Sequence, residues 1–137
     1  MKKVYPVIFT QTKTAVLVEI PDMEILTEGT DLENAIEMAR DAIGLKGITI
    51  QDEGIELPSA SRLEDIDIRK GTFAEEGKGI VSLVDIDFNV YRRKMDNKTV
   101  RRNVTLPNWL NQEAEAANIN VSKVLQDALM QKLNVSR

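Results

Sequence analysis

Cysteine and histidine are both absent from the 137 residues of this chain. The lack of cysteine excludes disulfide bonds, thiolate zinc sites and a cysteine nucleophile. The lack of histidine removes the usual general base, the Ser-His-Asp arrangement and nearly every transition-metal site, which leaves carboxylate-bound Mg²⁺ as the metal chemistry still open. We therefore expect a protein that is not an enzyme, with no catalytic residue, no metal site and no cofactor.

Long apolar runs are missing as well. No stretch approaches the ~20 residues that a membrane-spanning helix needs, and residues 1–13 contain no apolar segment of the signal-peptide type. Apolar residues make up 42% of the chain and charged residues 29%, as in ordinary globular proteins. These features predict a soluble, cytoplasmic protein.

Charge is divided unevenly along the chain. Residues 1–91 carry 18 acidic against 9 basic side chains, whereas residues 92–137 carry 4 acidic against 9 basic ones. An acidic region repels nucleic acid and attracts basic proteins, and a basic region favours contact with a polyanion such as DNA. The sequence therefore predicts two parts with different partners, although an acidic surface also serves solubility alone.

The first part has the pattern of a small α+β domain. Residues 4–10 and 14–20 are rich in β-branched and aromatic side chains, which predicts a β-hairpin, and residues 24–28 predict a short third strand. A capping box of Thr30 and Glu33 then begins a helix whose apolar positions repeat with helical spacing. A small sheet with one helix packed across it gives a fold of two layers.

Two glycines, Gly44 and Gly47, predict the end of this helix. Residues 51–79 are rich in Asp, Glu, Gly, Ser and Pro, which predicts a long loop with a short turn near residues 61–66. Residues 80–91 predict the longest strand of the sheet. Its alternation assigns six residues to the core face: Ile80, Ser82, Val84, Ile86, Phe88 and Val90.

The change in charge sets the expected domain boundaries. We predict a first domain over residues 1–91, a linker over 92–98 and a C-terminal module over 99–137. So small a module cannot build a core alone, because units below ~40 residues need metals, disulfides or oligomerisation. Dimerisation is the option that remains for a chain without cysteine and histidine.

The C-terminal module predicts one strand and two helices. We expect the strand over residues 99–106, a helix from Pro107 to about Asn118 and a second helix capped by Asn120. Pairing the strand with its copy from a second chain makes an antiparallel ribbon whose apolar face packs on the helices. The expected dimer core consists of Val104, Leu106, Leu110, Val124, Leu125 and Leu129.

The polar face of this ribbon fits a DNA major groove. Arg101, Asn103 and Thr105 lie on it, and arginine suits guanine as asparagine suits adenine. We expect these three residues to contact bases. The expected contacts to backbone phosphates come from Lys98, Asn120, Ser122 and Lys123.

Two ordered sets of residues resemble a known family. Residues 101–107 and 118–129 resemble the ribbon-helix-helix pattern, with asparagine at positions 118 and 120 in place of its usual glycine and serine. The first part looks like the HicB antitoxin domain. The resemblance rests on the segments at residues 5–9, 20–22, 27–29, 35–40 and 54–59.

The resemblance to HicB antitoxins implies a fold, a partner and a function. It implies a partial RNase-H-like fold in the first domain, followed by a ribbon-helix-helix dimer that represses its own operon by binding operator DNA. The implied partner is a small, basic HicA-like toxin that cleaves mRNA and is neutralised by the acidic domain. Asp85 and Asp87 are the expected toxin-binding residues, since carboxylates attract basic groups. The chain lacks the proline-glycine insertion common after the Pro-Asp pair, which affects loop geometry and toxin fit.

Two other functions remain open at this point. Asp85 and Asp87 share one strand face and have the spacing of Mg²⁺ ligands for phosphodiester hydrolysis, although such a site needs about four converging carboxylates. Alternatively, the chain is an autonomous ribbon-helix-helix repressor whose first domain senses a small molecule.

Overall fold

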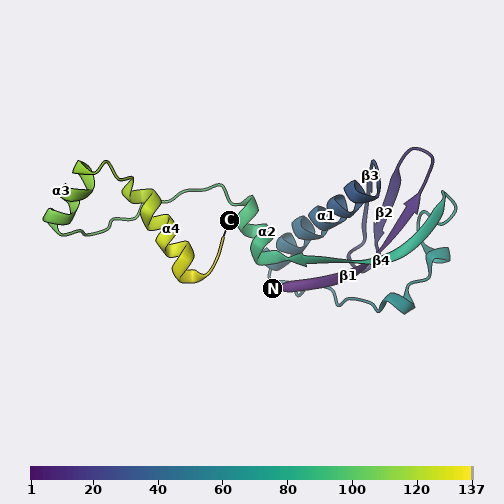
Figure 1. Cartoon of the computed structure of the whole chain (residues 1–137). Helices are drawn as coiled ribbons and strands as arrows, with labels where there is room; N and C mark the ends of the chain where they lie inside the picture. The colour runs from purple at the N-terminus through teal and green to yellow at the C-terminus, as the bar shows by residue number, and fades with distance from the viewer. Residues whose placement is uncertain (137) are drawn as a thin grey trace. The chain divides into compact units, whose positions relative to one another are not determined.

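The computed structural model describes residues 1–136, which form two compact units. The first unit spans Met1–Met95, and the second begins at Asp96 (Figure 1).

The first unit is a four-stranded sheet with a helix along one face (Figure 1). The strands are β1 (Lys2–Gln11), β2 (Val16–Ile20), β3 (Ile25–Gly29) and β4 (Lys78–Asp87). They pair antiparallel in the order β3-β2-β1-β4, and α1 (Leu32–Asp52) crosses the sheet. This arrangement confirms the predicted α+β class and the predicted hairpin.

The core lies between α1 and the sheet. Helix α1 contributes Ala35, Ala39 and Ile43, all with no exposed surface. Ala35 and Ala39 are small, which allows α1 to lie close to the strands. The strand residues in this core include Tyr5, Val7, Phe9, Val16, Val18, Ile20, Val84 and Ile86.

Helix α1 begins one residue later than the predicted capping box. Asp31 is the N-cap, and its carboxylate accepts a hydrogen bond of 2.8 Å from the Asn34 amide. Asn34 in turn accepts a 2.9 Å hydrogen bond from the amide of Thr30. The predicted capping box of Thr30 and Glu33 is therefore wrong: Asp31 caps the helix, and the Asn34 side chain binds the amide of the residue before the cap.

The predicted end of α1 at Gly44 and Gly47 is wrong, because the helix continues to Asp52. Both glycines instead make room for the short helix α2 (Phe88–Met95). A Cβ atom on Gly44 would lie 2.6 Å from Cδ2 of Tyr91, and one on Gly47 would overlap the ring of Phe88. Glycine is required here by helix packing.

Strand β4 ends at Asp87, so the prediction of a strand through residue 91 is wrong. The Asp87 carboxylate accepts a 3.0 Å hydrogen bond from the Asn89 amide and so starts α2. Helical spacing then buries Phe88 and Tyr91 against α1, while Val90 is 49% exposed. The predicted core face is correct at Val84, Ile86 and Phe88 and wrong at the other three positions, where Ile80, Ser82 and Val90 are exposed.

The predicted linker over residues 92–98 is also helical in its first half. Residues 92–95 are the last residues of α2 and belong to the first unit. Charge therefore changes sign inside the first unit and does not mark its end.

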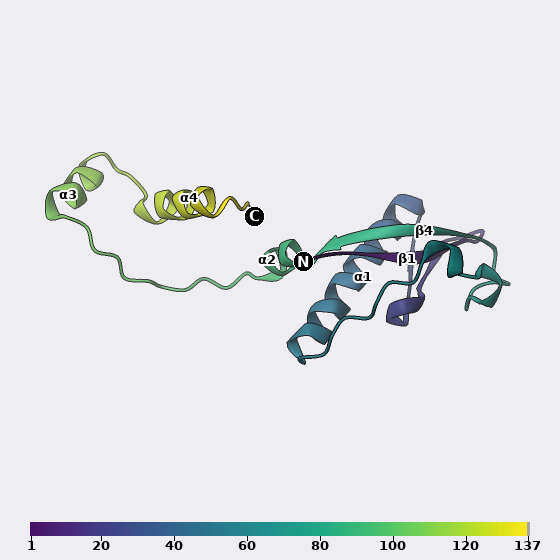
Figure 2. The ribbon, with the colours of Figure 1, turned by 90° about the horizontal axis from the view of Figure 1, so that it is seen from below.

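The segment between α1 and β4 runs back along the sheet (Figure 2). It contains two single-turn 3₁₀ helices, η2 (Leu63–Asp65) and η3 (Ile68–Lys70), and η2 confirms the predicted turn. The Ile68 side chain packs over Gly79 of β4, on the face of the sheet opposite α1. Glu19 holds the segment by accepting 2.8 Å hydrogen bonds from the amide and hydroxyl of Thr72.

The second unit contains two helices, α3 (Asn108–Ala116) and α4 (Val121–Leu133). Asn118 has a left-handed backbone (φ 59°) after α3, and Asn120 caps α4, as the sequence predicted. Residues 96–107 form neither helix nor strand in the single chain. A strand needs a hydrogen-bonded neighbour, and the expected neighbour of this segment is a second copy.

Candidate partner-binding surfaces

The second unit exposes an apolar surface that its own chain does not cover. Neither α3 nor α4 contains a buried residue. The six residues predicted for the dimer core are between 37% and 56% exposed: Val104, Leu106, Leu110, Val124, Leu125 and Leu129. Trp109 is exposed to 62% beside them. Exposed apolar side chains in this number are typical of a surface that contacts another molecule.

The three predicted base-contacting residues lie in the extended segment before α3. Arg101, Asn103 and Thr105 are all exposed, and none makes a hydrogen bond or ion pair within residues 1–136. Their polar groups are therefore available to a partner.

The four predicted phosphate-contacting residues fall at two places. Lys98 lies in the extended segment, whereas the other three lie at the start of α4. There the Asn120 side-chain oxygen accepts a 3.1 Å hydrogen bond from the Lys123 amide, so its NH₂ group alone is left for a phosphate. The Lys123 ammonium pairs with Asp127 at 3.5 Å, and an exposed pair of this kind is easily exchanged for a phosphate. Ser122 is exposed between them.

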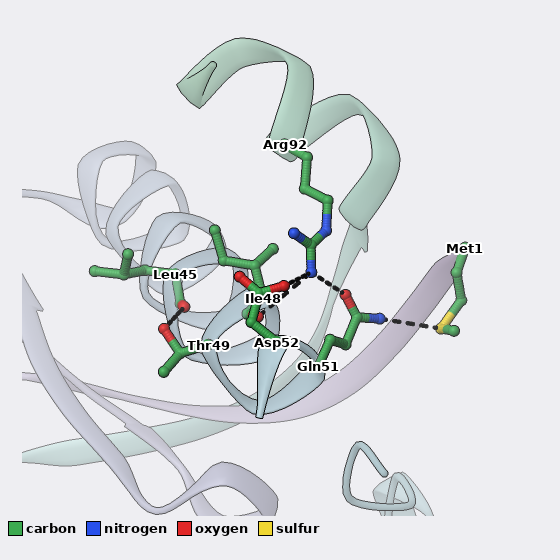
Figure 3. A network of polar contacts seen from close by, with 7 residues as sticks. All are labelled: Met1, Leu45, Ile48, Thr49, Gln51, Asp52 and Arg92. Atoms are coloured by element: carbon green, nitrogen blue, oxygen red, sulfur yellow. Dashed lines mark hydrogen bonds and ion pairs between the residues drawn. The ribbon is translucent and has the colours of Figure 1, made fainter. Parts of the chain in front are cut away.

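The second unit is less basic than the sequence division suggested. It carries 6 basic and 4 acidic side chains, because three basic residues at positions 92–94 belong to α2. Arg92 is already engaged: its guanidinium donates to Asp52 at 2.8 Å and to Gln51 at 3.0 Å, and it also reaches the Ile48 carbonyl at 3.4 Å (Figure 3). A cation at the C-terminal end of α1 also complements the helix dipole. Sequence reasoning missed this role of Arg92.

The two aspartates predicted to bind toxin both have partners in their own chain. Arg40 donates from Nε to the Asp85 carbonyl at 3.0 Å and forms an ion pair with its carboxylate at 3.2 Å. Asp87 accepts hydrogen bonds from the amides of Val90 and Asn89, which hold the pKa of its carboxyl below its ordinary value. Both carboxylates remain partly exposed, at 55% and 36%.

These aspartates line an open groove of about 770 Å³ between α1, α2 and the end of β4. Its wall includes Tyr91, whose hydroxyl donates a 2.9 Å hydrogen bond to Asp41. Burial, together with this hydrogen bond and the charge of Asp41, raises the pKa of Tyr91 to about 12. The groove mixes carboxylates with cations such as Lys2 and Lys94, so its charge is nearly balanced.

The described residues offer no metal centre. No group of three or more acidic side chains among residues 1–136 is placed to hold a metal ion. Asp85 and Asp87 thus lack the further carboxylates that a nuclease site requires. Within the same residues, no helix has the length and apolar character to cross a membrane.

Comparison with known proteins identifies the family. A family model described as HicB-like antitoxin of bacterial toxin-antitoxin systems matches residues 5–133. The chain belongs to this family. The match includes residues of both units and confirms the resemblance to HicB antitoxins.

Solved structures share the HicB fold. A chain of a toxin-antitoxin complex from Streptococcus pneumoniae superposes with a TM-score of 0.60 at 21% identity, over 96% of this chain and 99% of that one. The antitoxin HicB of Burkholderia pseudomallei gives 0.51 at 22% identity, over 96% of each chain. A chain of a HicA3 and HicB3 toxin-antitoxin complex gives 0.50 at 25% identity, over 62% of this chain and 99% of that one. No curated protein matches the chain.

Proposed function

We propose that this chain binds and neutralises a small, basic, HicA-like mRNA-cleaving toxin and represses its own operon as a ribbon-helix-helix dimer. Membership of the antitoxin family supports the first activity. A similar chain was solved as part of a complex of HicA3 with HicB3. The first unit is the toxin-binding unit in this proposal, because its acidic surface suits a basic partner.

The observation that carries the repressor activity is the uncovered apolar surface of the second unit. Its helices bury nothing within the chain, although α4 presents Val124, Leu125 and Leu129 together. A second copy supplies the missing cover, and residues 99–106 of the two copies then pair as an antiparallel ribbon.

The ribbon carries the DNA-reading residues. Arg101, Asn103 and Thr105 point outward from it into a major groove, where arginine and asparagine distinguish bases. The phosphate contacts come from Lys98 and from the start of α4. In a helix N-terminus, free amides and the helix dipole both favour a phosphate.

The test of the repressor activity uses the full chain and labelled duplex DNA from the region upstream of its own gene. We expect a dimer by light scattering that binds this DNA roughly a thousandfold more tightly than a shuffled duplex. Leu125→Glu should give a monomer that binds neither the upstream duplex nor the shuffled one, because a charge replaces an apolar contact of the dimer. A monomeric wild-type chain, or equal affinity for both duplexes, contradicts the proposal.

The test of the antitoxin activity is purification from the native host under mild conditions, followed by mass spectrometry. We expect a stoichiometric small basic protein that stops growth when it is produced alone. A homodimer that binds its promoter without such a protein would instead favour a sensor role for the first unit, with the groove beside Tyr91 as the ligand site.

A further inference from the structure

Strand β4 forms an edge of the sheet, and its outer side is open. It pairs with β1 over ten residues without interruption, and no strand among residues 1–136 lies beyond it. Two contacts show which backbone groups of β4 face β1 and which face outward. The Phe88 amide donates to the Met1 carbonyl at 3.0 Å, and Arg40 donates to the Asp85 carbonyl from outside the sheet.

Backbone groups alternate in direction along an antiparallel strand. The inward contact at Phe88 therefore assigns the even-numbered residues of β4 to β1 and the odd-numbered ones to the outside. Pro6 of β1 agrees with this pattern, because its missing N–H falls on the β2 side, where pairing begins only at Ile8. Within residues 1–136, the outward N–H and C=O groups of Val81 and Leu83 have no hydrogen-bond partner.

The middle of this edge, residues 79–84, lacks the features that normally protect an edge strand. Natural edge strands are short, twisted by bulges, or interrupted by proline or charge. Residues 79–84 contain no charged residue and no proline, and Ile80 and Leu83 are about half exposed, at 50% and 52%. The opposite edge strand, β3, has five residues and includes an exposed glutamate, Glu28.

The charged residues at the two ends of residues 79–84 determine which kind of strand can pair with this edge. Glu75, Glu76 and Lys78 precede the stretch, and Asp85 and Asp87 follow it, so carboxylates outnumber cations at its two ends. A second copy of β4 in antiparallel pairing would bring the two aspartates of each chain to the end that carries Glu75, Glu76 and Lys78 in the other. Lys78 offsets only part of the repulsion among these carboxylates. A strand with basic residues at its ends is complementary instead.

We propose that the toxin adds a strand with basic ends to the outer side of β4, next to Val81 and Leu83. This inference rests on the proposed antitoxin function and adds where and how the toxin is bound. The toxin's main chain completes the hydrogen bonds of Val81 and Leu83, and its basic side chains approach the acidic pairs. Arg40 limits the site, because it occupies the carbonyl of Asp85.

The decisive variant is Val81→Pro in the full chain, tested with the basic protein found in complex with the wild type. Proline removes the outward N–H and leaves the even-numbered hydrogen bonds to β1 in place. We expect affinity for the basic protein to fall about tenfold or more, with DNA binding unchanged. Val81→Ala is the matched control, since it shortens the side chain and keeps the N–H, and it should bind nearly as the wild type does.

Hydrogen exchange of the wild-type chain gives a second readout that needs no variant. The amides of Val81 and Leu83 should exchange quickly in the free chain and slowly in the complex, whereas those of Ser82 and Val84, which face β1, should be protected in both. Unchanged exchange at Val81 and Leu83 in a stable complex overturns the edge proposal and leaves the antitoxin function standing. If no basic protein binds the wild type, the antitoxin function itself fails. Protection of these amides in the free chain assigns the edge to a second copy and overturns the proposal.

Discussion

The ring of Tyr91 in α2 lies against the backbone of Gly44 in α1, with no space between them for a methyl group. This contact fixes α2 against α1, and the hydrogen bond from the Tyr91 hydroxyl to Asp41 sets the orientation of the ring.

Gly44→Ala should destabilise the first unit. The new methyl group would lie 2.6 Å from the Tyr91 ring, and such overpacking costs about 1 to 3 kcal/mol. Three ring atoms of Tyr91 lie within 2.8 Å of the new methyl group, so we expect a cost in the upper part of this range, above the ~1 kcal/mol that alanine gains over glycine inside a helix. Urea unfolding measures the difference, with Thr49→Ala at an exposed position of α1 as the control. Equal or greater stability of Gly44→Ala would show that α2 moves away freely.

Ionisation of Tyr91 should lower the free energy of unfolding at high pH. Its pKa is raised to about 12 in the folded chain from 10.0, so the unfolded chain loses this proton first as pH rises. The stabilisation is complete below about pH 10 and is lost between pH 10 and 12. Denaturant unfolding across this range should show a steeper loss for the wild type than for Tyr91→Phe. Parallel curves would mean that Tyr91 ionises as it does in the unfolded chain.

Arg92→Ala should affect stability and leave DNA binding unchanged. Its guanidinium is held by Asp52 and Gln51, and a partly exposed pair of this kind contributes about 0.5 kcal/mol. The contrast is Arg101→Ala, which should weaken operator binding without changing the unfolding of the first unit. Loss of operator affinity in Arg92→Ala would show instead that the basic residues 92–94 of α2 contact DNA.

Substitutions of Asn103 and Lys123 should change DNA affinity in different ways, the first with DNA sequence and the second with salt concentration. Asn103→Ala should cost ~1 to 3 kcal/mol on the operator and relax base preference. Lys123→Ala should weaken binding to all duplexes and reduce the salt slope by about 1. Fluorescence anisotropy on operator and shuffled DNA at several salt concentrations separates the two. Equal losses on both duplexes for Asn103→Ala would remove it from base contact.

Local signals predicted much of this molecule. The hairpin follows from β-branched runs, and the αL turn and N-cap of the second unit follow from Asn118 and Asn120, because caps depend on the residues at the helix end. The exposed positions of Val124, Leu125 and Leu129 also agree with a helix stripe that needs a partner. These features depend on residues close together in the sequence.

Helix α2 was missed because its cause lies elsewhere in the chain. Ile86, Phe88 and Val90 continue the alternation of β4, and a strand was the simpler prediction. The helix gains its packing from Gly44 and Gly47, some forty residues earlier. The spacing of Phe88 and Tyr91, with Asp87 before them, was the available signal. The partners of Asp85 and Arg92 depend on the same long-range packing and had no local signal.

Because the helices of the second unit are uncovered in the single chain, we expect the folded fraction of this unit to depend on chain concentration. In the proposed dimer, the core of the second unit exists only between two copies, so its stability depends on chain concentration. The sheet unit, whose core is complete within one chain, has no such dependence. Dilution would therefore remove operator binding while the first unit stays folded, so that repression reports how much of the chain the cell contains.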